Sequence, residues 1–368
     1  MKKSVFYFLS VGLGFLMCGQ IMDAASRAHE RMVYTEASSL TLVGKLFPDT
    51  PNPYHRVDTV RYKGFTASEN IQVRYSSGIA CVFRTDASFI SVLTEWGKVG
   101  EQTNTNDISA HGYDLYIKKD GQWVFAGAAT NVMKNMDKPV SLAREMEPGM
   151  KECLLYLPTY SEQYSVKIGV EEGAVIEAAE NPFRHRIGVF GSSYTHGSST
   201  GRSGMTWPAQ FSRMTGLQLL SLGCSGNSKL QDYFADVLAH AEMDALLLDA
   251  FSNPTAEMIE ERLFPFIETV QKAHPGMPII FQRTIYRPNR VFNTLSEKNE
   301  SAKMAMADSL MRIACKKYKD VWYITPDPVA KDHTATIDGV HPSNYGYTLW
   351  AKSIVRPVRR ILKRYGIR

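Results

Sequence analysis

The chain has 368 residues, of which 44% are hydrophobic and 21% are charged. These proportions are typical of a folded globular protein and exclude an intrinsically disordered one, and the length favours two domains over a single hydrophobic core. The formal net charge of +5 is small, and much of the excess lies in residues 356–368, where basic side chains complement the dipole of a terminal helix. The charge therefore gives no reason to expect a nucleic-acid partner.

The N-terminal residues have the pattern of an export signal. Two lysines precede a largely apolar run over residues 5–17, and small residues follow near position 24. This pattern predicts a signal peptide over residues 1–24 and a protein that works in the periplasm or outside the cell. A lipid anchor on Cys18 is the alternative, although Met17 is a poor fit to the small residue that such sites prefer. No interior segment is long and apolar enough to predict a transmembrane helix.

Four cysteines follow the predicted signal peptide. They are far apart along the chain, and most of them lie within apolar runs, so we expect buried free thiols, although an oxidising compartment would also allow pairing. The sequence has no CxxC pair and no histidine spacing typical of zinc sites, and it predicts neither a metal site nor a cofactor. The four residues are Cys81, Cys153, Cys224 and Cys315.

The predicted N-terminal domain, residues 25–180, alternates apolar and polar residues over short runs. Segments such as GYDLYIKKDGQWVFAG and QYSVKIGV are interrupted or followed by turn sequences such as KDG and EEG. A period of two broken by turns is typical of antiparallel strands, and several such segments in succession favour an all-β sandwich.

The predicted C-terminal domain, residues 181–368, alternates strand and helix patterns. Strands that alternate with helices form parallel sheets covered on both faces, so we expect an α/β domain. In such sheets the functional groups lie beyond the carboxyl ends of the strands. The predicted strands are residues 187–190, 217–222, 245–248, 279–281 and 321–324, and the predicted helices include residues 257–270, 298–318 and a closing helix around 354–365.

The stretch GVFGSSYTHG, residues 188–197, places two serines directly after the first of these strands. A serine at a strand-to-helix turn lies where free backbone N–H groups and the helix dipole favour a developing negative charge, so Ser193 is a candidate nucleophile. The alternative is that Ser192 or Ser193 only caps the helix.

Two later strand ends carry candidate hydrogen-bond donors. Gly226 lies in a Gly/Ser turn after the second strand, where a glycine lets its backbone N–H approach a ligand, and Asn253 follows the third strand with a neutral amide. Together with the backbone N–H of Ser193, they would form an oxyanion hole with three donors. Taken singly, each residue has a structural alternative, as an ordinary turn glycine and as a turn or cap residue before Pro254.

The fifth strand leads into TIDGVHPSNYG, where Asp338 and His341 are three residues apart. This spacing lets a carboxylate orient an imidazole and stabilise its protonated form while the imidazole accepts a proton from a hydroxyl. A surface turn with an incidental histidine is the alternative. Four such features at four separate strand ends favour one shared catalytic site over coincidence.

Three further residues are candidate substrate contacts. His196 lies three residues after Ser193, so on a helix it would face the same way, as a second base, a substrate contact or a polar residue at the rim. Arg283 and Tyr286 follow the fourth strand in the segment FQRTIYRP, with Arg287 beside them. An arginine there would either meet an acidic sugar or fix a loop, and the sequence does not separate these two roles.

The blocks at the strand ends resemble those of the SGNH (GDSL-like) hydrolase family, which supplies Ser, Gly, Asn and a terminal Asp-x-x-His in this chain order. The matching positions are Ser193, Gly226, Asn253, Asp338 and His341. The residue before Ser193 is a serine where the family has an aspartate, and because that aspartate is not the triad acid, the change need not abolish activity. The resemblance implies a three-layer α/β/α domain with a flavodoxin-like parallel sheet.

The first half resembles the sandwich domain that precedes one branch of the SGNH esterases. Its GxDLY signature corresponds to GYDLY at residues 112–116, and LYLPTY at residues 155–160 fits the same domain. The resemblance implies an all-β, jelly-roll-like domain in front of the catalytic domain.

The two resemblances together imply a secreted serine esterase that works through an acyl-enzyme. His341 would take the proton of Ser193, which attacks an ester carbonyl, so Ser193→Ala is expected to abolish hydrolysis. Export and the preceding sandwich favour a glycan substrate, and the resemblance implies hydrolysis of its O-acyl esters, O-acetyl esters above all. The sandwich would either present the polymer or only brace the catalytic domain. The alternatives are an inactive carbohydrate-binding protein on this scaffold and a lipase or acyltransferase with the same triad. The sequence does not indicate the oligomeric state.

Overall fold

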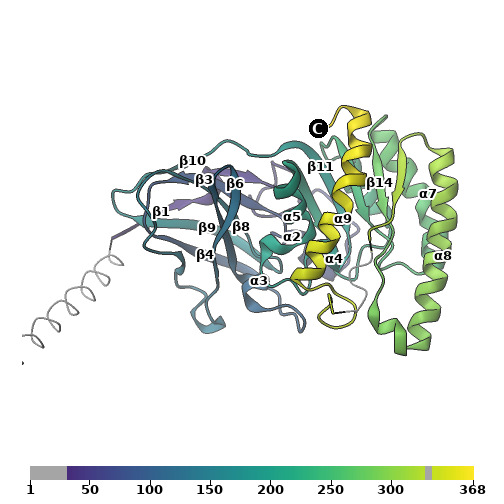
Figure 1. Cartoon of the computed structure of the whole chain (residues 1–368), viewed down its shortest axis with the longest axis horizontal. Coiled ribbons are helices and arrows are strands. Elements are labelled where there is room, and N and C mark those ends of the chain that lie inside the picture. The colour runs from purple at the N-terminus through teal and green to yellow at the C-terminus, as the bar shows by residue number, and fades with distance from the viewer. Residues whose placement is uncertain (1–30, 328–333) are drawn as a thin grey trace, which may run out of the picture.

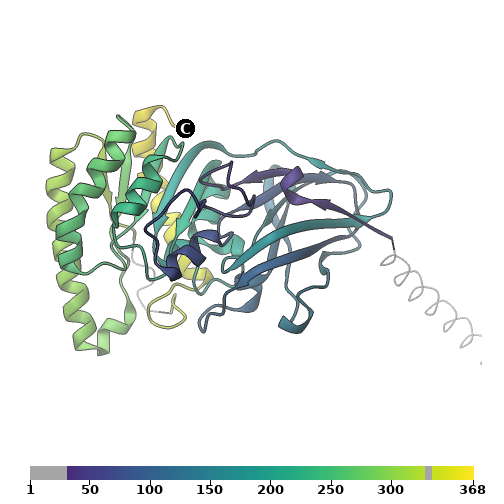
Figure 2. The same cartoon turned by 180° about the vertical axis from the view of Figure 1, so that it is seen from behind.

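The computed structural model describes residues 31–327 and 334–368. The predicted signal peptide and Cys18 lie outside the described residues. Within them, two antiparallel sheets precede one parallel sheet, so the predicted fold class, an all-β sandwich followed by an α/β/α domain, is confirmed. Figures 1 and 2 show the sandwich and the α/β/α domain next to each other along the long axis of the molecule.

The sandwich consists of two sheets that share one core. The first sheet has the strand order β1-β9-β4-β7, and the second has the order β10-β3-β8-β5-β6, with β2 paired to β3. Two short helices, α2 (Ala67–Arg74) and α3 (Asp107–His111), lie in its connections. The strands are β1 (Met32–Glu36), β2 (Thr41–Val43), β3 (Ala80–Thr85), β4 (Ile90–Val99), β5 (Tyr113–Lys119), β6 (Gln122–Ala129), β7 (Val140–Ala143), β8 (Lys151–Tyr156), β9 (Ser161–Glu171) and β10 (Ile176–Ala178).

Two strands of the second sheet, β3 and β8, are buried on both faces. Cys81 and Phe83 of β3 point into the sandwich core, whereas Val82 and its neighbour Leu154 on β8 belong to a cluster with Ala209 of the other domain. Consecutive residues of one strand point to opposite faces, so a strand covered on both sides has an unbroken run of buried residues. The contact with the α/β/α domain explains why β3 and β8 contain continuous apolar runs.

The parallel sheet has the strand order β12-β11-β13-β14-β15. All five strands predicted for the second half are present and parallel. The first strand, β11, lies between β12 and β13, so the strand order reverses at β11, and the crevice beyond the carboxyl ends at this point is where α/β sheets bind ligands. The strands are β11 (Arg184–Gly191), β12 (Leu217–Gly223), β13 (Ala245–Asp249), β14 (Ile279–Gln282) and β15 (Val321–Ile324).

Helices cover both faces of this sheet. On one face, α5 and α9 pack together, and the rings of Trp207 and Trp350 stack at 5.8 Å between centroids. On the other face, α6, α7 and α8 cover the sheet. The helices of this domain are α4 (Ser193–His196), α5 (Trp207–Thr215), α6 (Asp232–Ala239), α7 (Ala256–Ala273), α8 (Thr294–Lys317) and α9 (Asn344–Leu362).

Local sequence signals fix the ends of these helices. The α5 helix begins after Thr206, whose side chain accepts a hydrogen bond from Ala209 N–H, and Pro208 occupies its first turn. It ends at Thr215 and is followed by Gly216, which has a φ of 74° in the left-handed region that glycine adopts at little cost. Thr255 and Ser343 cap α7 and α9 in the same way as Thr206 caps α5.

The cysteines differ in their exposure. Cys81, Cys153 and Cys224 are buried and free, as expected, but Cys315 is free and exposed, so the expectation of burial is wrong for this residue. It lies near the C-terminal end of α8. Across residues 31–327 and 334–368, no group of three or more His, Cys, Asp or Glu side chains is placed to hold a metal ion.

The two domains are joined by a short connection. The last sandwich strand, β10, ends at Ala178, and the parallel sheet begins at Arg184. We propose that the domain boundary predicted after residue 180 lies in this connection. None of the helices in the described part of the chain combines the length and the hydropathy that crossing a membrane requires.

Candidate active site

The turn after β11 places two serines in different roles. Ser192 is the N-cap of α4, and its Oγ accepts a hydrogen bond from Tyr194 N–H at 3.2 Å. Ser193 is therefore the first residue of the helix, and its Oγ lies 2.9 Å from Nε2 of His341. Gly191 makes the turn possible because a Cβ at this position would collide with the side chain of Thr195. The capping interpretation thus holds for Ser192, while Ser193 is left to contact the histidine.

The buried carboxylate of Asp249, at the end of β13, holds this turn. Its Oδ2 accepts hydrogen bonds from Ser192 Oγ at 2.7 Å and Thr195 Oγ1 at 3.2 Å, and its Oδ1 accepts from Ser252 Oγ at 2.8 Å. Burial raises the pKa of Asp249, and the hydrogen bonds from Ser192 and Ser252 oppose that shift. The chain has a serine where the family has an aspartate, and here the neighbouring strand supplies a carboxylate to that serine. Sequence analysis missed Asp249, although an aspartate at the end of the apolar run ALLLD was a signal.

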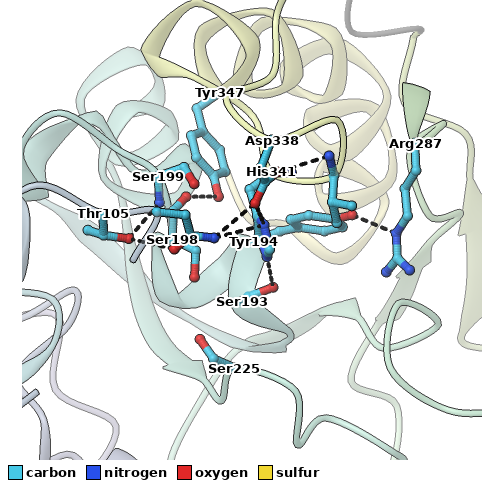
Figure 3. Close-up of polar contacts among 12 residues, drawn as sticks. Thr105, Ser193, Tyr194, Ser198, Ser199, Ser225, Arg287, Asp338, His341 and Tyr347 are labelled. Carbon is cyan, nitrogen blue, oxygen red and sulfur yellow. Dashed lines mark hydrogen bonds and ion pairs between the residues drawn. The ribbon is translucent and has the colours of Figure 1, made fainter. Parts of the chain in front are cut away.

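The loop after β15 brings a carboxylate to the other side of the imidazole (Figure 3). Asp338 Oδ2 lies 2.8 Å from His341 Nδ1, and Asp338 Oδ1 accepts the backbone N–H groups of Val340 at 2.9 Å and His341 at 2.7 Å. Burial alone would raise the pKa of Asp338, but the hydrogen bonds from His341 N–H and from the Asn104 amide lower it well below its ordinary value. An ionised carboxylate at Nδ1 favours the tautomer with its proton on Nδ1, which leaves Nε2 free to accept the proton of Ser193.

Three candidate hydrogen-bond donors belong to Ser193 and to the segments that follow β12 and β13. Gly226 has a φ of 71°, in the left-handed region, and a Cβ there would meet nothing within 4 Å. Asn253 Oδ1 accepts a hydrogen bond from Ser228 N–H at 3.3 Å, which turns its Nδ2 amide group the other way as a donor. Within the described residues, no acceptor is paired with the backbone N–H of Ser193 or Gly226 or with the Asn253 amide N–H. Ser225, the residue before Gly226, lies on the opposite side of Ser193 from Asp338 in Figure 3.

Asn104 reaches the site from the sandwich domain. It lies between β4 and α3, and its Nδ2 is 3.0 Å from Asp338 Oδ2 and 3.1 Å from His341 Nδ1. Sequence analysis missed this residue. Nothing in the surrounding sequence EQTNTND marks one asparagine as a partner of a residue more than two hundred positions away.

The expectation that His196 lies at the rim or contacts the substrate is wrong. The side chain is completely buried, its Nε2 lies 2.7 Å from the carbonyl oxygen of Thr159, and its ring stacks on Tyr160 at 4.2 Å between centroids. Burial, together with the nearby Arg56 charge, lowers its pKa well below the ordinary value. The α4 helix has four residues and all of them are buried, so the position three residues after Ser193 points into the domain junction.

Two arginines after β14 contact neighbouring segments of the same domain, Arg283 through Asp308 and Arg287 through Tyr194. Arg283 Nε and Nη2 donate to the Asp308 carboxylate of α8 at 3.0 and 3.1 Å, so this arginine fixes a helix instead of meeting an acidic sugar. Tyr286 is 41% exposed, with the guanidinium of Arg290 at 4.9 Å from its ring centroid, and its role as a substrate contact stays a proposal. Arg287 Nε donates to the hydroxyl of Tyr194 at 2.8 Å (Figure 3).

Comparison with sequence families agrees with this arrangement. The model of the GDSL-like lipase/acylhydrolase family matches residues 184–359. The model of the GxDLY domain, described as the N-terminus of SGNH-hydrolase-type esterases, matches residues 32–176. No curated protein matches the chain.

Solved structures include one similar protein that decides the family. A protein from Bacteroides ovatus described as a GDSL-like lipase is 35% identical, with a TM-score of 0.86, and the match covers 90% of this chain and 98% of that one. This chain belongs to the GDSL-like lipase/acylhydrolase family. Its membership of the SGNH-type esterases indicates that its reaction is the hydrolysis of acyl esters.

Two more distant structures show the same fold. The salicylyl-acyltransferase SsfX3 from a tetracycline biosynthetic pathway is 21% identical, with a TM-score of 0.67, and the match covers 92% of this chain and 99% of that one. A family two carbohydrate esterase from Cellvibrio japonicus is 11% identical, with a TM-score of 0.57, and the match covers 90% of this chain and 98% of that one. At these identities the likeness concerns the fold and leaves the substrate open.

Proposed function

We propose that the protein is an exported serine esterase that removes O-acyl groups, O-acetyl groups in particular, from saccharides through an acyl-enzyme on Ser193. The observation that carries the proposal is the chain of contacts from Ser193 Oγ to His341 Nε2 at 2.9 Å and from His341 Nδ1 to Asp338 at 2.8 Å. A hydroxyl, an imidazole and a carboxylate in this order form the machinery of nucleophilic acyl transfer.

In the first half of the reaction, His341 Nε2 takes the proton of Ser193 Oγ as that oxygen bonds to the ester carbonyl carbon. The tetrahedral intermediate then collapses, the bond from the carbonyl carbon to the sugar oxygen breaks, and the imidazolium gives its proton to the leaving sugar hydroxyl. In the second half, water transfers a proton to His341 and attacks the acyl-enzyme. The carboxylic acid leaves, and Ser193 recovers its proton.

The charge that develops on the carbonyl oxygen would be stabilised by neutral donors. These are the backbone N–H groups of Ser193 and Gly226 and the side-chain amide of Asn253, whose orientation is set by Ser228. Donors fixed before the reaction lower the barrier because they need not reorganise as the charge forms.

The saccharide part of the proposal rests on a groove between the domains. It has a volume of about 650 Å³, and all of its lining residues are uncharged, with hydroxyl and amide side chains that include Thr103, Asn104 and Asn344. Tyr345 at this groove is 58% exposed. Because Asn104 lines the groove and also contacts Asp338, the groove borders the candidate triad. Neutral polar groups with an exposed aromatic ring suit a neutral sugar better than an acyl chain.

A comparison of two substrates tests this proposal. Purified protein is assayed for acetate release from a panel of acetylated polysaccharides and for hydrolysis of p-nitrophenyl acetate. We expect activity on both, a loss of about 10⁴-fold or more in Ser193→Ala, and in Tyr345→Ala a KM raised several-fold for the acetylated oligosaccharide alone. Normal turnover by Ser193→Ala would overturn the mechanism, and wild-type protein that binds the glycans without releasing acetate would favour a binding protein. Acetate transferred to an added sugar would indicate an acyltransferase.

Export is proposed from the N-terminal sequence alone. Expression of the full chain with subcellular fractionation and N-terminal sequencing of the mature protein tests it. We expect a mature chain that starts near residue 25 outside the cytoplasm, and an uncut chain in the cytoplasm would contradict the proposal.

A further inference from the structure

The loop between β4 and α3 crosses from the sandwich to the candidate triad. From this loop, Asn104 places its Nδ2 at 3.0 Å from Asp338 Oδ2, although 234 positions separate the two residues in the chain. The same carboxylate oxygen accepts the Nδ1 proton of His341 at 2.8 Å. Two donors from two different domains therefore share one oxygen.

We propose that Asn104 is a positioning residue for the esterase reaction. Asn104 holds the Asp338 carboxylate and tunes the basicity of His341, so that the sandwich domain completes the catalytic site. This inference rests on the proposed function of the Ser193, His341 and Asp338 group. It assigns the sandwich a part in the chemistry, beyond presenting a polymer or bracing the catalytic domain.

The direction of the Asn104 amide follows from its neighbour. Thr105 Oγ1 donates to Asn104 Oδ1 at 3.3 Å, so the carbonyl side of the amide faces Thr105 and the N–H side faces Asp338. An imidazole nitrogen that donates to a carboxylate cannot also accept a hydrogen bond, so the Asn104 proton goes to Asp338 Oδ2 and not to His341 Nδ1, despite the short distance to both.

The loop that carries Asn104 is fixed to both domains. Thr105 Oγ1 also accepts a hydrogen bond from the backbone N–H of Ser199 at 2.9 Å, a contact drawn in Figure 3. Asn106 caps α3 through Ser109 N–H at 2.9 Å, and Gly100 N–H donates to the carbonyl oxygen of Tyr160 at 2.8 Å. A side chain held by such a frame keeps its geometry without reorganisation during the reaction.

The titratable groups around Tyr194 and Asp338 do not change charge in the relevant pH range. The ring of Tyr194 on α4 lies 5.6 Å from that of His341 between centroids, and burial raises the pKa of Tyr194 to about 12. Burial also raises the pKa of Tyr347 on α9 well above its ordinary value. Arg287, which donates to the Tyr194 hydroxyl, keeps its positive charge. Asp338 is thus the titratable group through which a change at Asn104 acts on His341.

The expected sign follows from electrostatics. The Asn104 N–H withdraws negative charge from Asp338 Oδ2 and points its positive end toward the imidazole, and both effects disfavour the imidazolium. Removing the amide should therefore move the acidic limb of the kcat/KM profile to higher pH, by about half a unit, while less precise positioning lowers kcat about tenfold. Asn104→Asp should move the acidic limb further, to higher pH by about one pH unit or more, because an added negative charge at this distance favours the imidazolium.

The experiment uses the full mature chain with Asn104→Ala, the isosteric Asn104→Asp, and Gln102→Ala as the matched control on the same loop, where Gln102 is exposed. Profiles of kcat and KM for p-nitrophenyl acetate between pH 5 and pH 9 should place the acidic limb in the order wild type, Asn104→Ala, Asn104→Asp. The control should overlay the wild type, and KM should stay within twofold.

A purely structural role would lower kcat without moving the limb, so superimposed limbs in the three Asn104 forms would overturn the inference. If Asn104→Ala does not fold, the isosteric Asn104→Asp variant decides alone. An acidic limb of Asn104→Asp at the same pH as that of the wild type would then contradict the proposal. If the wild-type protein does not hydrolyse the ester, the proposed function fails separately. Proton NMR titration of His341 in the wild type and the two variants then tests the same order of midpoints without turnover.

Discussion

The two domains contribute to the candidate site in different ways. The α/β/α domain carries the groups that would react or stabilise charge, at the ends of β11, β12, β13 and β15. The sandwich supplies groups that hold them, of which Asn104 touches Asp338 directly. Reactive groups follow strand ends, so a sequence pattern reveals them, whereas holding groups depend on how two domains meet.

The junction of the domains illustrates the same division. Asp114, the aspartate of the GYDLY segment, is fully buried and accepts hydrogen bonds from Arg202 Nη1 at 2.8 Å and from Gly204 N–H at 2.8 Å. Burial raises the pKa of Asp114, and the Arg202 charge opposes that shift. Arg202 and Gly204 lie in the segment that follows α4. The sandwich motif therefore anchors the chain just beyond the proposed nucleophile.

A second sandwich carboxylate supports the loop of Gly226. Glu69 of α2 is buried and accepts hydrogen bonds from Gln231 Nε2 at 3.0 Å and the hydroxyl of Tyr233 at 2.9 Å. Gln231 Nε2 in turn donates to the carbonyl oxygen of Asn227 at 2.7 Å, which is the residue after Gly226. The sandwich thus holds segments on both sides of the proposed catalytic pocket.

The largest effect on turnover among the supporting residues is expected at Asn253. Asn253→Ala should lower kcat by about 10²–10³-fold, because the oxyanion loses one of its donors. The KM for p-nitrophenyl acetate should change little, because the lost contact forms in the transition state. Steady-state kinetics measures both values, and Asn253→Asp, which keeps the shape but not the donor, should lose at least as much. A kcat within threefold of the wild type in either variant would remove Asn253 from the proposed oxyanion hole.

A change at the junction should affect stability more than chemistry. Asp114→Ala leaves Arg202 without its buried partner and should lower the free energy of unfolding by about 2–3 kcal/mol, less than for a fully buried pair because Arg202 is partly exposed. Urea unfolding of the mature chain gives the value. The matched control is Glu152→Ala in the same sheet, which breaks the exposed pair with Lys118 and should cost less than about 1 kcal/mol. Equal losses in the two variants would contradict the role given to Asp114.

A smaller, pH-dependent effect is expected within the sandwich. Burial alone would raise the pKa of Glu162, but hydrogen bonds from His55 and Lys98 N–H, with the Arg74 charge, lower it to about 2. A lowered pKa in the folded state stabilises the protein above the ordinary value for glutamate, and this contribution is lost as the pH falls through the folded pKa. Glu162→Gln should therefore lower the free energy of unfolding by about 1–2 kcal/mol at pH 7. The difference in stability between the variant and the wild type should shrink between pH 4.5 and pH 2. Thermal unfolding of both proteins across this range measures it, and a difference that stays constant or grows would contradict the account.

The sequence predicted the parallel sheet and the contact between two of the candidate reactive groups. The five parallel strands were within three residues of their observed bounds because their cores are continuous apolar runs. Asp338 and His341 were predicted as a pair, and they are in contact, because a three-residue spacing in one loop constrains their separation.

The rest depended on packing that a pattern does not carry. His196 was misplaced because helical spacing says which residues share a side, but not that the sandwich covers that side. The sequence left the role of Arg283 open because the residue after a strand can turn to either layer, and here Arg283 meets Asp308 on α8. Asn104 contacts Asp338 across the domain junction, and no local pattern predicts that contact. The strand pattern places Asp249 at the end of β13, but it does not tell that the carboxylate contacts Ser192.

Covalent trapping tests the central claim most directly. The mature protein is treated with a fluorophosphonate, which reacts with activated serine hydroxyls, and peptide mass spectrometry locates the adduct. The account predicts one phosphonylated residue, Ser193, and loss of the adduct in His341→Ala. An adduct on a different serine in protein that hydrolyses esters, or labelling of Ser193 that is unchanged in His341→Ala, would contradict it.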